Sequence, residues 1–180
     1  MLIYSSLFIT PSTYAYTPEE GNVSAVLGPY VYKTNFENAS SGVTSPYFGG
    51  VGLMAIGDIN SKGSLEIAMF YMNKLYVREK DLKYLAEKTG QVHIVMGYRR
   101  WLTSYISTSL GFYSSYPIGD YSTVKNDHSS TAIIDTSARD GTTYGLELAF
   151  QYELWTQGRY AAVLDTRYAR SITSKDHENS

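Results

Sequence analysis

The 180-residue chain contains no cysteine, which excludes disulfide bridges and thiolate metal sites. Charged residues are scarce as well: they make up 18% of the sequence, whereas soluble domains contain about a quarter. The formal net charge of −2 offers no basic face, which argues against a nucleic-acid partner. A shortage of charge is expected when the surface of a protein faces something other than water.

The sequence also lacks any run of about 18 apolar residues, which excludes a membrane-spanning helix. A membrane protein built from this chain must therefore be a closed β-barrel, because only that structure also satisfies every backbone polar group in lipid. The chain is long enough for one soluble domain or one small barrel. We expect a single domain over residues 16–180.

Tyrosine is the abundant aromatic residue, with 18 copies against 6 phenylalanines and 2 tryptophans. Its apolar ring and polar hydroxyl suit a boundary between hydrocarbon and water. Soluble all-β proteins can also be rich in tyrosine, so this count favours a membrane boundary without deciding it.

The clearest pattern in the chain is the strict two-residue alternation from Thr142 to Trp155. One face of this predicted strand is apolar, with Tyr144, Leu146, Leu148, Phe150, Tyr152 and Leu154. The opposite face is small or charged, with Gly145, Glu147, Ala149, Gln151 and Glu153. A soluble sheet would turn the apolar face into a core, whereas a membrane barrel would turn it towards lipid.

Similar alternation predicts six more strands, although Val26 and Pro29 blur the faces of the first one. Their ranges are 22–34, 46–58, 64–78, 91–101, 105–116 and 159–171. Residues 79–90 are compatible with a short helix through Leu82 and Leu85, or with the top of a tall hairpin, which we favour because both neighbours are strands. The expected fold is all-β: an antiparallel up-and-down transmembrane β-barrel with seven visible strands.

The connections between these strands alternate in length. Those at 35–45, 79–90 and 117–141 are long. Those at 59–63, 102–104 and 156–158 are short. Bacterial outer-membrane barrels have this asymmetry, with short periplasmic turns and long extracellular loops. A soluble meander has no reason to keep all its long loops at one end, so the pattern favours lipid.

Barrels of this class have even strand numbers, so seven strands require an eighth. We expect the closing strand beyond Ser180, and the alternative is that residues 2–10 close the barrel. Residues Met1 to Ala15 instead resemble the later part of a signal peptide with cleavage after Ala15, although a basic n-region is missing.

Over about Gly21 to Ser180, this strand periodicity and loop asymmetry resemble the small eight-stranded outer-membrane barrels of the OmpA, OmpX and OmpW type. No short signature motif carries the resemblance, and the terminal aromatic residue of such barrels is missing. The resemblance implies a monomer without cofactor in the outer membrane of a Gram-negative envelope, in contact with lipid and lipopolysaccharide. Its implied roles are structural anchoring, adhesion of the surface loops to a partner, or porin-like passage of small solutes.

Two sets of residues follow from the alternation. We predict a polar network in the lumen formed by Glu66, Lys74, His93, Arg99, Glu147, Gln151, Glu153, Asp165 and Arg167. We predict a lipid-facing set formed by Leu65, Ile67, Ile94, Leu110, Leu146, Leu148, Phe150 and Leu164. Charges in a narrow lumen must be paired or hydrated, so we interpret the first set as a salt-bridged plug, with a selective polar pathway as the alternative.

Catalysis and metal binding receive little support from the sequence. Asp127, His128, Ser129 and Ser130 are neighbours in the long loop, but a catalytic triad needs fixed mutual geometry, so we interpret them as a solvated loop. His93, His128 and His177 lack metal-ligand spacing, and no glycine-rich phosphate loop occurs. We expect no enzyme activity, metal or cofactor.

A soluble β-barrel that binds an apolar ligand remains the alternative function. In that protein Tyr144, Leu146, Leu148 and Phe150 would point inward around the ligand. Extraction from membranes only by detergent would support the membrane barrel, and recovery in aqueous buffer would support the soluble one.

Overall fold

The computed structural model describes residues 16–33, 46–80, 83–128 and 141–173, and every regular element in them is a β-strand. The strands are β1 Val23–Tyr32, β2 Phe48–Asn60, β3 Gly63–Lys80, β4 Lys83–Trp101, β5 Ile106–Asn126, β6 Thr143–Gln157 and β7 Tyr160–Ser171. They form one sheet in chain order, and each strand is antiparallel to the next. The predicted all-β, up-and-down class with seven strands is confirmed.

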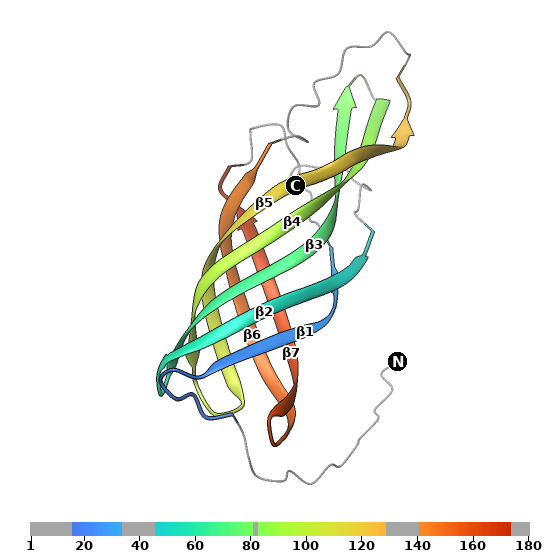
Figure 1. Ribbon diagram of the computed structural model, residues 1–180. Helices are drawn as coiled ribbons and strands as arrows, with labels where there is room; N and C mark the ends of the chain where they lie inside the picture. The colour runs from blue at the N-terminus through green and yellow to red at the C-terminus, as the bar shows by residue number, and fades with distance from the viewer. Residues whose placement is uncertain (1–15, 34–45, 81–82, 129–140, 174–180) are drawn as a thin grey trace, which may run out of the picture.

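The sheet is curled into a half-barrel whose two edges are β1 and β7 (Figure 1). Its inner face is buried and its outer face is exposed, because the alternation of the sequence carries through the strands. In β6, for example, Glu147, Ala149 and Gln151 are buried, whereas Leu148 and Phe150 between them are exposed. In β1 the same alternation continues through Val26 and Pro29 without a change of face.

The tall hairpin predicted at residues 79–90 is present, and the helix alternative is wrong. β3 and β4 stay paired up to Lys80 opposite Lys83. β5 also extends beyond its predicted end at Tyr116 and pairs with β4 up to Asn126 opposite Leu85. The first residues of the predicted loop at 117–141 are therefore part of a strand. They form hydrogen bonds with β4, and nothing in their polar sequence predicts this partner. Together β3, β4 and β5 project beyond the other strands (Figure 1).

Three short turns lie at the opposite end of the sheet, as the sequence predicts (Figure 1). They join Asn60 to Gly63, Trp101 to Ile106 and Gln157 to Tyr160. In the last turn Gly158 has a φ of 61°, a backbone conformation that glycine adopts without steric cost. The predicted signal peptide at residues 1–15, the connection at 35–45 and residues 129–140 of the connection at 117–141 lie outside the described residues.

Within the described residues, no helix is long and apolar enough to cross a membrane.

The inner face carries only a small apolar core. Its members are Met54, Ile56, Ala68, Val95 and Tyr113. Polar and charged side chains occupy more of the buried positions around it, and these hold the candidate site.

Candidate functional site

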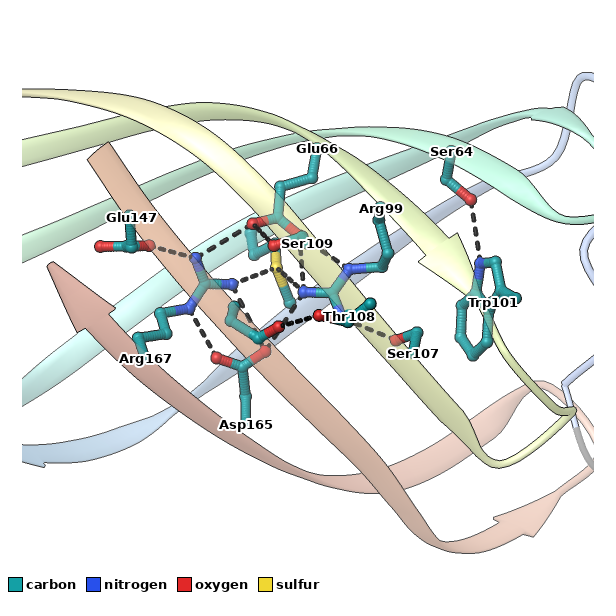
Figure 2. A network of polar contacts seen from close by, with 12 residues as sticks. Ser64, Glu66, Arg99, Trp101, Ser107, Thr108, Ser109, Glu147, Asp165 and Arg167 are labelled. Atoms are coloured by element: carbon teal, nitrogen blue, oxygen red, sulfur yellow. Dashed lines mark hydrogen bonds and ion pairs between the residues drawn. The ribbon is translucent and has the colours of Figure 1, made fainter. Parts of the chain in front are cut away.

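Arg99 is the centre of a buried ion-pair network on the inner face (Figure 2). Its side chain has no exposed surface. The guanidinium places Nη2 2.5 Å from Glu66 Oε2 and donates a hydrogen bond of 2.7 Å from Nε to the same oxygen. Nη1 donates to Ser107 Oγ at 2.7 Å. Because Glu66 is in β3, Arg99 in β4 and Ser107 in β5, these contacts bind three strands across their inner face.

Arg167 forms the second half of the network from the edge strand β7 (Figure 2). Its Nη1 lies 3.0 Å from Glu66 Oε1 and 2.7 Å from Glu147 Oε1. Its Nε lies 2.5 Å from Asp165 Oδ1, while the other oxygen of Asp165 lies 3.3 Å from Arg99 Nη2. Glu66 and Asp165 thus each contact both guanidinium groups, and the two arginines form one network rather than two pairs.

His93 extends this network along β4. Its Nε2 lies 3.0 Å from Glu147 Oε2, and its Nδ1 shares a hydrogen bond of 2.7 Å with Ser115 Oγ. The imidazole ring also lies against the Tyr113 ring, with 4.5 Å between ring centroids and a tilt of 32° between their planes. Both nitrogens are therefore satisfied, and the histidine is held in one orientation.

The charges in the network nearly balance. Three carboxylates, from Glu66, Glu147 and Asp165, face the guanidinium groups of Arg99 and Arg167. Burying an isolated charge has a large unfavourable desolvation free energy. Even a buried ion pair offsets this free energy only when its geometry is good and additional hydrogen bonds are formed. This arrangement meets that requirement, so its chemistry is that of a structural cross-link.

The structure brings together six of the nine residues predicted for the lumen: Glu66, His93, Arg99, Glu147, Asp165 and Arg167. The other three lie on the inner face but outside the network. Lys74 lies over the Tyr76 ring, 4.9 Å from its centroid. Glu153 accepts a hydrogen bond from the Thr156 hydroxyl. Gln151 is 4% exposed, and its Oε1 is buried without a hydrogen-bond partner.

The sequence prediction missed the uncharged members of the site. Besides Ser107 and Ser115, Ser109 donates to Glu66 Oε1 at 3.2 Å. Met54 places its sulfur 3.0 Å from Arg167 Nη2. All of these positions fall on the inner register of their strands, so the two-residue period could have found them if it had been applied to uncharged side chains.

Aromatic rings line the inner face beside the network. Phe70 contacts Tyr30 edge to face, with 5.2 Å between centroids, and Arg167 lies over the Phe70 ring at 5.2 Å. Gly52 provides the room for this ring, because a Cβ at residue 52 would lie 2.5 Å from Phe70 Cδ1. The glycines on this face of β2 therefore admit large aromatic side chains from neighbouring strands.

A second polar cluster lies near the short turns. Tyr16 donates to Asp58 Oδ2 at 2.6 Å, and Ser64 donates to Asp58 Oδ1 at 2.6 Å. Trp101 donates in turn to Ser64 at 3.0 Å, and its ring lies 4.7 Å from that of Tyr16. Burial, followed by the hydrogen bond to the Asp58 carboxylate, raises the pKa of Tyr16 above its ordinary value. The cluster ties the segment before β1 to the sheet.

The outer face carries the apolar side chains. Of the predicted lipid-facing set, Leu65, Ile67, Leu110, Leu146, Leu148, Phe150 and Leu164 are exposed, and Ile94 is half-buried. In β6 the exposed apolar residues run from Tyr144 to Leu154 and Trp155. The outer face of β7 likewise carries Tyr160 and Tyr168 on either side of Leu164. Aromatic residues thus lie at both ends of the apolar stretch of each strand.

The described part of the polar loop shows no catalytic geometry. Lys125 Nζ lies 2.9 Å from Asp127 Oδ2, and this hydrogen bond lowers the pKa of Asp127. The backbone N–H of His128 donates to Asn126 Oδ1 at 2.9 Å. Ser129 and Ser130 lie outside the described residues. No group of three or more metal-ligating side chains was found in the ranges that the structure describes.

Comparison with protein-family models, with curated proteins and with solved structures finds no match to this chain.

Proposed function

We propose that this chain is a small outer-membrane β-barrel protein with a structural role in a Gram-negative envelope, similar in architecture to the OmpA, OmpX and OmpW type. Its outer face contacts lipid, its tall β3–β4–β5 sheet projects from the membrane surface, and its charged interior is a plug. No enzyme activity or cofactor is part of the proposal.

The main support for this proposal is that polar side chains are buried while large hydrophobic side chains are exposed, the reverse of a soluble protein. Among the described residues, 14 polar or charged side chains are buried against 9 hydrophobic ones, while 32 large hydrophobic side chains are exposed. Monomeric soluble proteins rarely expose contiguous apolar surface on this scale. In a membrane barrel the lipid-facing band is apolar and the interior is polar, so the distribution is the expected one.

The dimensions of the apolar stretch support the same proposal. From Tyr144 to Leu154 the backbone of β6 advances by about 34 Å, at about 3.4 Å per residue. With a tilt of about 45°, this corresponds to about 24 Å of height, close to the apolar band of about 25 Å in outer-membrane barrels. Exposed aromatic residues mark the two ends of the stretch, Tyr144 at one and Trp155 at the other, as is typical of the two membrane interfaces.

The soluble alternative does not fit the faces of β6. It requires Tyr144, Leu146, Leu148 and Phe150 to surround a ligand inside the sheet, and all four lie on the exposed face. The inner face offers ion pairs and hydroxyl groups instead.

Membrane fractionation tests the proposed function. We expect the full chain expressed with an export signal to sediment with outer membranes, to resist extraction by carbonate and to dissolve in detergent. Unheated samples should migrate differently from boiled samples on gels, because folded barrels resist dodecyl sulfate. Recovery of folded protein in aqueous buffer without detergent would refute the proposal.

A further inference from the structure

Ser115, His93 and Glu147 form a hydrogen-bonded chain across three neighbouring strands. His93 Nδ1 lies 2.7 Å from Ser115 Oγ, and His93 Nε2 lies 3.0 Å from Glu147 Oε2. A hydroxyl, an imidazole and a carboxylate in this order and at these distances match a nucleophile, its general base and the group that orients the base. The ion pairs of the network require Glu147, but they require neither Ser115 nor its contact with His93.

The contacts of Glu147 place the imidazole proton where a general base needs it. A carboxylate accepts hydrogen bonds, so His93 Nε2 carries the proton and donates to Glu147. The Nδ1 atom of a neutral imidazole is then an acceptor, and the Ser115 hydroxyl donates to it. Arg167 Nη1 lies 2.7 Å from the other oxygen of Glu147 and holds the carboxylate in place. Ser115 therefore directs its proton towards a base that is able to accept it.

The three residues lie at the end of the inner face that is remote from the short turns. Ser115 pairs with Thr143, the first residue of β6. The last residue of β7 is Ser171, which pairs with Gly145. Ser115, Thr143 and Ser171 all line a cavity of about 1130 Å³ on the inner face. Within the part of the chain that the structure describes, a small molecule thus has a route to Ser115 from the rim of the sheet, without passing Arg99.

The surroundings of Ser115 indicate a class of substrate. The rings of Tyr113 and Phe70 lie beside the imidazole, with centroids 4.5 Å and 6.2 Å from that of His93. Both rings line the cavity and provide an apolar wall for an acyl group. Thr143 is the cross-strand neighbour of Ser115, and such neighbours have Cβ atoms about 4.5–5.5 Å apart. Its hydroxyl is therefore near enough to donate a hydrogen bond to an oxyanion that forms at Ser115.

We propose that Ser115 is the nucleophile of a carboxylic-ester hydrolase site, with His93 as general base and esters of uncharged, apolar acyl groups as substrates. Ser115 Oγ bonds to the carbonyl carbon while its proton moves to His93 Nδ1. The ester C–O bond then breaks, and the alcohol leaves with that proton. Water, deprotonated by the same imidazole, hydrolyses the acyl-serine, which releases the carboxylic acid and restores Ser115. Glu147 is a positioning residue, and the activity is additional to the structural role proposed above.

This site is separate from the polar loop. Sequence reasoning does not detect it, because His93 is 22 residues from Ser115 and 54 residues from Glu147. The pairing of β5 with β4 and with β6 brings the three side chains to one place. In the described part of the loop, by contrast, Asp127 contacts Lys125, and only the backbone of His128 is hydrogen-bonded.

Covalent labelling of the full chain folded in detergent micelles tests the proposal. The probe is an alkyl fluorophosphonate, which phosphonylates an activated serine with loss of fluoride, and mass spectrometry locates the label. We expect Ser115 to react about 100-fold faster than Ser114, its neighbour on the outer face. His93→Gln should slow the labelling of Ser115 by about 100-fold. Ser114→Ala is the matched control and should leave that labelling unchanged.

Turnover is measured with p-nitrophenyl butyrate in the same micelles. We expect the native chain to release p-nitrophenol continuously and Ser115→Ala to release none above the rate of micelles alone. Thr143→Val should slow the release by about 100-fold, because the oxyanion loses a donor. Heat-modifiable migration identifies the variants that fold.

The native chain alone can overturn this inference, so the result does not depend on whether a variant folds. A Ser115 that stays unlabelled, or that reacts as slowly as Ser114, is not activated. Labelling without release of p-nitrophenol would exclude a hydrolase, and turnover that persists in folded Ser115→Ala would exclude Ser115 as the nucleophile. None of these outcomes bears on the proposed function, which fails separately, through membrane fractionation.

Discussion

Arg99 and Arg167 differ in how completely the protein encloses them. Arg99 has no exposed surface, while the Arg167 side chain on the edge strand is 13% exposed. Removing one partner of a buried ion pair leaves the other charge without compensation, which costs more than the pair itself contributes. The energetic importance of the network is therefore expected to be greatest at Arg99.

Arg99→Met should lower the free energy of unfolding by about 3–5 kcal/mol, because the Glu66 carboxylate would remain fully buried with less compensation. Urea unfolding in lipid vesicles measures this change. Arg100→Met is the matched control, since residue 100 is the exposed neighbour in β4, and its effect should stay within about 0.5 kcal/mol. Equal losses in the two variants would contradict a stabilising network.

Tyr16 gives the chain a pH dependence at its short-turn end. Its pKa is raised from the ordinary value of 10.0 by burial and by Asp58. A raised pKa in the folded state stabilises the protein fully below the pKa of the unfolded state, and this stabilisation is lost as the pH rises above it. The advantage of the native chain over Tyr16→Phe should therefore be constant up to about pH 10 and shrink above it. Unfolding free energies of both proteins measure this, and a difference independent of pH would refute it.

At the level of elements, the sequence predicted strands and faces better than strand ends. The alternation in β6 correctly predicted which of its residues are buried and which are exposed. The register of such a strand is strongly specified, because a shift by one residue would turn every side chain to the other face. The upper part of β5 was predicted as loop, since Pro117, Gly119 and Asp120 disfavour strands. Pairing with β4 overrides that local preference, and no pattern within 117–126 reveals the partner.

The ion-pair network was only partly predictable from the sequence, because its contacts also depend on how the strands are arranged in space. Alternation identifies which side chains face inward, but contacts such as Arg167 with Glu66 depend on how far the sheet curls. Strand order alone places β7 four strands from β3. The curling of the sheet brings them together, and this is a property of the whole sheet.

Leu148→Arg tests the outer face of β6. Leu148 lies midway between Tyr144 and Tyr152 and is 54% exposed. Arginine at the bilayer midplane should destabilise the folded, inserted protein by about 2–4 kcal/mol, while the same residue near an interface costs about 0–1 kcal/mol. Gln157→Arg at the end of β6 is the control. Folding yield in vesicles, read from heat-modifiable migration, measures both, and equal yields would contradict a lipid-facing band.

For the whole molecule, the ion-pair network implies an interior that is blocked by paired side chains. Its contacts reach from Met54 in β2 to Arg167 in β7 and involve each strand between them. An interior of about eight strands is nearly filled by side chains, so we expect no unitary conductance in planar bilayers. Heat-modifiable migration of the same sample provides the control for insertion. Discrete conductance steps would contradict the plug and favour a solute pathway.

Single-cysteine scanning of β6 tests whether the exposed face of the sheet lies against lipid. Because the chain has no cysteine of its own, a fluorophore on each introduced cysteine from Leu146 to Gln151 reports one site. In vesicles with nitroxide-labelled lipid chains, we expect strong quenching at Leu146, Leu148 and Phe150 and weak quenching at Glu147, Ala149 and Gln151. Uniformly weak quenching, with all six positions reactive to a water-soluble thiol reagent, would show that this face does not lie against lipid.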